Sequence, residues 1–179
     1  MADKRIEGKK VLLVAPQTQF REEEVFETKR ILERAGAEVG IASTEARTCR
    51  GMREGTVEAK VAIANVNPDG YDAVVLAGGS SVPALFWNDK ALRELVSGMA
   101  AAGKIVAAIS LSTVVLARAQ LLEGRAATVY FLPEAIDELK NAGATYSEEK
   151  LIVDGQLIMA EGPEQVRGFG DAIVSALAG

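Results

Sequence analysis

The residue best placed to do chemistry in this sequence is Ser110. It follows the apolar run Ile105 to Ile109, and the segment after it carries apolar residues at helical spacing, at Val114, Val115, Leu116 and Ala119. This order predicts a strand, a sharp turn and a helix, with Ser110 at the turn. Ligands and reacting groups lie outside the carboxyl ends of the strands in an open parallel sheet, so the turn presents the Ser110 hydroxyl to whatever the protein binds.

The chemistry open to Ser110 is restricted by the absence of histidine from the 179 residues. An alcohol is a poor nucleophile at neutral pH unless a neighbouring group removes its proton. Histidine is the usual general base and also the commonest transition-metal ligand. With a single cysteine, Cys49, the chain also lacks the ligands of ordinary zinc, copper or haem sites. We therefore expect no metal and no cofactor.

Charge and hydropathy exclude further classes. The net charge is −5, from 25 acidic and 20 basic residues, and the basic residues are scattered, which argues against a nucleic-acid partner. No apolar run reaches about 18 residues, and the first ten residues lack the apolar core of a signal peptide, so we expect neither membrane insertion nor export. Cys49 cannot form an internal disulfide, which is typical of a reducing compartment. These features predict a cytoplasmic protein.

The rest of the chain predicts one domain, residues 1–179, in which strands alternate with helices. Short apolar runs without alternation, typical of parallel strands buried on both faces, lie at 10–15, 38–43, 71–77 and 105–109. Helical spacing of apolar residues predicts helices at 22–35, 82–87, 89–101, from 133 and from 162 to about 177. We also expect a polar loop at 17–24, a hairpin or irregular excursion at 44–67, a strand at 126–130 and an Asp-Gly hairpin at 151–159.

Five segments, taken in order, carry a resemblance to a known family. They read AGAEVGIAS, NPDGYDAVVLAGGS, AGKIVAAIS, LLEGRAAT and VDGQLIMAEGP. The set resembles the ThiJ/PfpI family, within the class I glutamine-amidotransferase-like superfamily, over about residues 9–178. The resemblance implies a flavodoxin-like three-layer α/β sandwich with a central, mostly parallel sheet and a small added β-hairpin, usually as a homo-oligomer. Residues 1–8 are then expected to form a flexible N-terminal extension.

The resemblance also assigns site residues. Active members carry a turn that reads roughly Ala-Ile-Cys-His-Gly-Pro, where the cysteine is the nucleophile, and the matching residues here are 108–113, with Ser110 at the cysteine position. Glu24 matches a family glutamate that contacts the nucleophile, from a pattern similar to Phe-Glu-Asp-x-Glu. The amides of the oxyanion hole match Gly79, preceded by Gly78, and Leu111. A tyrosine near the nucleophile matches Tyr130.

Ser110 and Glu24 can be interpreted as a catalytic pair or as an anchor. A carboxylate with a pKa of about 4 is a weak base unless burial raises that value strongly. We expect Glu24 to lie about 2.5 to 3.0 Å from the Ser110 hydroxyl, because the turn is retained. We also expect Ser110 to have a strained backbone, as at other nucleophile turns. Two origins stay open for Ser110: a natural member that has lost its chemistry, or a native cysteine changed to serine.

These residues favour a catalytically silent protein that acts by binding a small molecule or a partner. One alternative is a cysteine-type hydrolase or a glyoxalase- or deglycase-like enzyme whose nucleophile has been replaced by Ser110, and another is a stress-related holdase chaperone, since the family that the chain resembles includes all of these. Outside the site, Glu22 and Glu23 are interpreted as a solvated first helical turn. Trp87 and Phe86 fit core packing as well as they fit a pocket rim or a subunit contact, and Cys49 is given no role.

Overall fold

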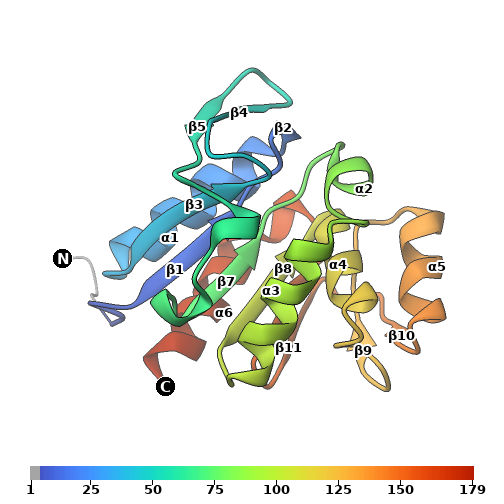
Figure 1. Cartoon of the computed structure of the whole chain (residues 1–179). Helices are drawn as coiled ribbons and strands as arrows, with labels where there is room; N and C mark the ends of the chain where they lie inside the picture. Colours follow the sequence, from blue (N-terminus) through green and yellow to red (C-terminus); the bar gives the residue numbers. More distant parts are fainter. Residues whose placement is uncertain (1–4) are drawn as a thin grey trace.

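The computed structural model describes residues 5–179, and within them seven strands form a central sheet in the order β11-β12-β8-β7-β1-β3-β6 (Figure 1). All neighbouring pairs are parallel except β11 and β12, which form the expected Asp-Gly hairpin at one edge. The predicted α/β sandwich with a mostly parallel sheet is confirmed. The strands are β1 (Lys10–Val14), β3 (Glu38–Ser43), β6 (Val61–Ala62), β7 (Ala73–Leu76), β8 (Ile105–Ile109), β11 (Leu151–Asp154) and β12 (Leu157–Ala160).

Helices cover both faces of the sheet because the central strands are apolar on both sides. In β1, Val11 and Leu13 pack with α1 (Thr28–Arg34) and α6 (Val166–Ala178), whereas Leu12 and Val14 pack with the helices of the other face. That other face carries α3 (Lys90–Ala101) and α4 (Thr113–Arg118), which lie in front of the sheet in Figure 1. The helices outside these two layers are α2 (Val82–Leu85) and α5 (Pro133–Asn141), with short 3-10 turns at η2 (Ile63–Asn65), η3 (Pro68–Gly70), η4 (Ser110–Ser112) and η5 (Pro163–Gln165).

Two smaller sheets lie outside the central sheet; the first contains the hairpin expected within 44–67, and each also departs from the sequence-based expectations. The excursion at 44–67 contains the antiparallel pair β4 (Thr48–Gly51) and β5 (Thr56–Glu58), joined by an unexpected strand, β2 (Thr18–Phe20), from the predicted polar loop. The strand predicted at 126–130 is limited to β9 (Ala126–Ala127), which pairs with β10 (Thr145–Tyr146) outside the central sheet. Beyond β9 the chain returns to the end of β8, where the Tyr130 amide donates to the Ser110 carbonyl over 3.3 Å instead of continuing a strand.

The N-terminal residues of the described part belong to the core. Ile6 is buried, and its amide donates to the Ala35 carbonyl at the end of α1 over 3.0 Å. The expected extension therefore does not include Ile6, and residues 1–4 lie outside the described residues. Within residues 5–179, no helix has the length and apolar character needed to cross a membrane.

Two helical glycines provide a matched test of how tightly α1 and α6 pack. A Cβ atom at Gly170 in α6 would lie 2.8 Å from Ile31 Cδ1, whereas a Cβ at Gly98 in α3 would meet nothing within 4 Å. We expect Gly98→Ala to raise the free energy of unfolding by about 1 kcal/mol through helix propensity. Gly170→Ala should lower the free energy of unfolding by about 1 to 2 kcal/mol, because the cost of overpacking against Ile31 exceeds the gain in helix propensity. Urea denaturation measures both, and a stabilised Gly170→Ala protein would contradict the packing.

Candidate functional site

Ser110 lies at the turn between β8 and α4, in a backbone conformation that non-glycine residues rarely adopt. Its φ is +61°, in the left-handed region, and the preceding Ile109 is still extended. The expected strained turn from strand to helix is confirmed. Such a conformation costs about 1 to 3 kcal/mol and persists only where the surroundings enforce it.

Three hydrogen bonds hold the turn in place. The Trp87 Nε1–H donates to the Leu111 carbonyl over 3.0 Å, and the Ser112 hydroxyl donates to the Ala77 carbonyl over 2.7 Å. The Tyr130 amide donates to the carbonyl of Ser110 itself. Trp87 is therefore part of the buried support of the turn, together with the fully buried Phe86, rather than part of a pocket rim.

Glu24 lies directly beneath the turn and is fully buried. The Ser110 hydroxyl donates to its Oε1 over 2.5 Å, as expected, and the Gly78 amide donates to its Oε2 over 2.6 Å. A Cβ atom at Gly78 would lie 2.5 Å from Glu24 Oε2 and 2.6 Å from Ser110 Cβ, so glycine is required there for the carboxyl to fit. Glu24 is positioned by a π-helical turn, η1 (Glu23–Glu27), which widens the start of the helix that continues as α1.

Burial raises the pKa of Glu24 from the usual 4.5 to about 7. Loss of solvation is the largest cause, and the hydrogen bonds from Ser110 and Gly78 oppose it, followed by the positive charge of Arg21. Glu23 adds a small raising effect. At neutral pH the protonated and the ionised forms of this carboxyl group are therefore both accessible.

A pocket of about 260 Å³ opens above Ser110. The predicted residues Gly79, Leu111 and Tyr130 line it together with Ser110, so the structure brings these four together and places Gly78 and Glu24 beneath them. Sequence reasoning missed the other lining residues, which are Arg21, Met52, Ser80, Pro83, Leu132 and Pro163. They come from separate loops, and the resemblance assigned no role to any of them.

The backbone conformation at position 79 and a close neighbouring strand both require glycine there. The φ of Gly79 is +152°, and a Cβ atom there would lie 2.1 Å from the Gln19 carbonyl oxygen, where the end of β2 crosses the loop. The close crossing sets the Phe20 backbone against Gly79 and fixes the position of Arg21, whose amide donates to the Gly78 carbonyl over 2.9 Å. The role of the Gly79 and Leu111 amides in holding an oxyanion stays a prediction.

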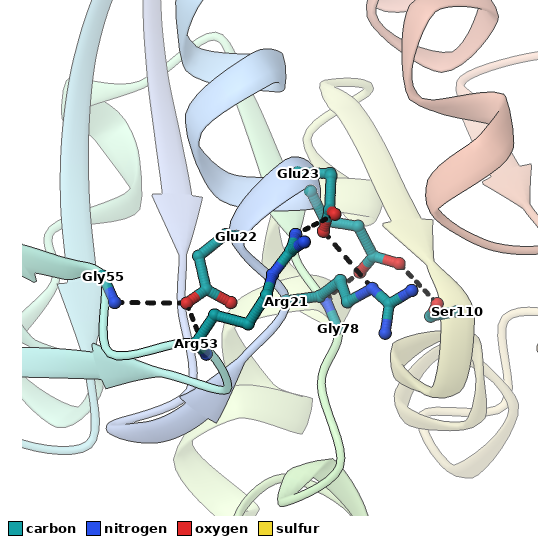
Figure 2. Close-up of polar contacts among 8 residues, drawn as sticks. Arg21, Glu22, Glu23, Arg53, Gly55, Gly78 and Ser110 are labelled. Atoms are coloured by element: carbon teal, nitrogen blue, oxygen red, sulfur yellow. Dashed lines mark hydrogen bonds and ion pairs between the residues drawn. The ribbon is translucent and has the colours of Figure 1, made fainter.

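The interpretation of Glu22 as a solvated residue is wrong. Glu22 is buried, and its Oε2 accepts hydrogen bonds from the Arg53 and Gly55 amides over 2.7 and 3.2 Å (Figure 2). A carboxylate that accepts two amides ties the tip of the β4–β5 hairpin to η1 and so places Met52 at the pocket. Glu23 is partly exposed and pairs with the side chains of both Arg53 and Arg21.

No group of three or more histidine, cysteine, aspartate or glutamate side chains in residues 5–179 is arranged to hold a metal ion. Cys49, the free thiol, is buried away from the pocket, where the Gln17 side-chain amide donates to its sulfur over 3.5 Å. Burial raises the pKa of this thiol, which makes it a packing residue rather than a reactive one.

The fold and the strained turn define an α/β protein with a nucleophile-type elbow at the carboxyl end of a parallel strand. A family model described as the DJ-1/PfpI family matches residues 9–176. The chain therefore belongs to the DJ-1/PfpI family, as its sequence segments predict.

Three similar proteins illustrate the relationship. The uncharacterized protein MJ0967 of Methanocaldococcus jannaschii is 44% identical over 168 residues, which cover 94% of this chain and 82% of that protein. Deglycase PfpI of Pyrococcus furiosus is 32% identical over 152 residues, covering 85% of this chain and 90% of that protein. The crystal structure of a ThiJ/PfpI domain protein from Brachyspira murdochii superposes with a TM-score of 0.89 at 30% identity, covering 95% and 98% of the two chains.

The buried carboxyl of Glu24 should make stability depend on pH. Because its folded pKa is raised, the folded protein retains the proton, and the associated stability is fully present below pH 4.5 and is lost as the pH rises through about 7. Glu24→Gln keeps the shape without the charge, so it should be more stable than the original chain by about 3 kcal/mol at pH 8.5 and nearly equal at pH 5. Urea denaturation across this range measures the difference.

The exposed Glu94→Gln provides the control, because the Glu94 carboxyl is largely solvated and pairs with Lys90 on the surface of α3. Its stability should stay within about 0.5 kcal/mol of the original chain at every pH. A Glu24→Gln protein that is equally destabilised at both ends of the range would show that Glu24 is charged when buried.

Proposed function

We propose that this DJ-1/PfpI chain is a catalytically silent member of the family that binds a small molecule in the pocket above Ser110. The observation that carries the proposal is that an alcohol stands at the nucleophile position, where the Ser110 hydroxyl donates to Glu24, in a sequence that contains no histidine. An alcohol is a poor nucleophile unless a base removes its proton, and the protonated fraction of Glu24 cannot do so. The pair is therefore suited to fixing the turn and to presenting a hydroxyl to a ligand.

The residue after Ser110 supports the same conclusion. Leu111 occupies the position where the resemblance expects a histidine, and its apolar side chain borders the pocket. A leaving group bound there meets methyl groups instead of an imidazole that could give it a proton. The remaining wall is mainly apolar and includes Pro83, Leu132 and Pro163. Such a wall, with a few polar groups at one end, is typical of small-molecule sites.

Catalysis is a second candidate, and two observations favour it. Several similar proteins are named deglycases, among them the Pyrococcus furiosus protein. The ionised fraction of Glu24, with a pKa of about 7, lies within hydrogen-bonding distance of Ser110, which is the geometry required of a general base. A cysteine at position 110 would need less activation, since a thiol is intrinsically more nucleophilic than an alcohol.

Turnover with a glyoxal substrate and a peptide substrate separates the two candidates. We expect Ser110→Ala to change no measurable turnover, because the hydroxyl has no catalytic part. If the original chain turns over either substrate and Ser110→Ala abolishes that activity, the silent-site proposal is wrong.

The pairing of positions 24 and 110 can be tested with Ser110→Cys and a thiol-alkylating reagent. At pH 8 the introduced thiol should react at least threefold faster when Glu24→Gln is also present, because a buried carboxylate opposes formation of the thiolate. The original chain, whose thiol is the buried Cys49, gives the background rate. Equal rates with and without Glu24→Gln would contradict the pairing.

We also propose that the chain forms a homo-oligomer, as the family resemblance implies. A two-fold dimer is the simplest form, since it is the commonest closed assembly of identical subunits. Sedimentation at micromolar concentration should give about twice the monomer mass. A monomer at every concentration tested would rule the proposal out.

A further inference from the structure

Arg21 supplies the charge of the pocket above Ser110. It is the charged residue among those that line the pocket, and its side chain is 41% exposed. Figure 2 shows its guanidinium directed toward Ser110. The lining contains no carboxylate, although the chain as a whole carries a net charge of −5. A single guanidinium at the polar end of an otherwise apolar pocket favours an anionic ligand.

The charges of Glu23 and Arg53 determine how far the charge of the Arg21 guanidinium is neutralised within the protein. The Arg21 Nε lies 3.3 Å from Glu23 Oε2, a distance typical of a loose ion pair, and no hydrogen bond of acceptable geometry forms there. The other oxygen of Glu23 is taken by the side chain of Arg53. Glu23 is therefore shared between two arginines, which leaves Arg21 under-neutralised and able to bind a carboxylate through its terminal nitrogens.

Ser110 and Glu24 lie at the same end of the pocket as Arg21. The Ser110 hydroxyl donates to Glu24 while that carboxyl is ionised. When Glu24 takes up a proton from solvent on Oε1, that proton can be donated to the Ser110 oxygen, and the serine hydrogen becomes free to point into the pocket. The same proton removes a buried negative charge from beneath the ligand. The charged groups that act on Glu24 are Arg21 and Glu23, and its other partner is the neutral Gly78 amide.

We propose that the pocket binds a small organic monocarboxylate, with its carboxylate held by the Arg21 guanidinium and the Ser110 hydroxyl and its apolar part against Tyr130 and Leu132, and that binding places a proton on Glu24. The proposal rests on the proposed binding function and names its ligand class. The modest size of the pocket, about 260 Å³, limits the ligand to a small molecule. No bond is made or broken in the ligand.

Phenylacetate and its neutral amide, phenylacetamide, differ in charge but hardly in shape, so they test the proposal by calorimetric titration. At pH 6 we expect phenylacetate to bind at least tenfold more tightly than phenylacetamide. Arg21→Gln should weaken the binding of phenylacetate at least tenfold, a change of about 1.4 kcal/mol, and leave the binding of phenylacetamide within twofold, because only the carboxylate loses charge-assisted hydrogen bonds. Arg34→Gln, an exposed arginine in α1, is the control and should change neither.

The coupled proton gives a second measurement on the same proteins. Phenylacetate stays ionised between pH 6 and 8.5, yet its affinity for the original chain should fall at least fivefold over this range as Glu24 loses its proton. Glu24→Gln should bind with nearly constant affinity. Equal binding of the two compounds, an unchanged affinity in Arg21→Gln, a pH dependence that survives Glu24→Gln, or no binding of either compound at millimolar concentration would overturn the inference. Turnover abolished by Ser110→Ala would instead overturn the proposed function, so the two failures are distinguishable.

Discussion

The site depends on one constraint, which is that a carboxyl group buried beneath a strand end must have its hydrogen-bonding capacity satisfied. Glu24 meets this constraint with the Ser110 hydroxyl and the Gly78 amide, two groups far from it in sequence. Position 78 must be glycine because a Cβ there would overlap the carboxyl, and the left-handed backbone of Ser110 brings the hydroxyl to it. The strained backbone of Ser110, the glycine at position 78 and the widened η1 turn therefore form one arrangement around Glu24.

A second layer of charged groups connects this arrangement to the surface. Glu22 binds the amides of the β4–β5 hairpin, and Glu23 lies between Arg21 and Arg53. The three consecutive glutamates thus have three different environments: one buried against a hairpin, one shared between arginines on the surface, and one enclosed beneath the turn. Loss of solvation raises the pKa of Glu24, whereas at Glu23 the loss of solvation is outweighed by hydrogen bonds and by the charges of Arg53 and Arg21, which lower its pKa.

The chain belongs to a family with members named deglycases, and the structure retains most of the arrangement that the family resemblance implies for the site. The elbow, the paired glycines and the buried glutamate are all in place, and each would serve a reaction as well as a bound ligand. Serine at position 110 and leucine at position 111 stand where the family resemblance implies cysteine and histidine, in a sequence with no histidine. Fold membership therefore leaves the function to be settled at these side chains.

The sequence by itself determined the order of the main strands and helices of the sandwich, the two-sided burial of the central strands and the place of Ser110, because apolar periodicity and strand-turn-helix order are local properties of the chain. The family resemblance added Glu24, Gly78, Gly79, Leu111 and Tyr130, and the structure brings them together. Only the tertiary structure decided that β2 exists, that Glu22 is buried and that Arg21 faces Ser110. These features depend on contacts between segments about 30 to 90 residues apart, as in the bond from Ser110 to Glu24. Local pattern carries no record of such contacts, since they are fixed when the sheet assembles and loops from different strands meet at its carboxyl edge.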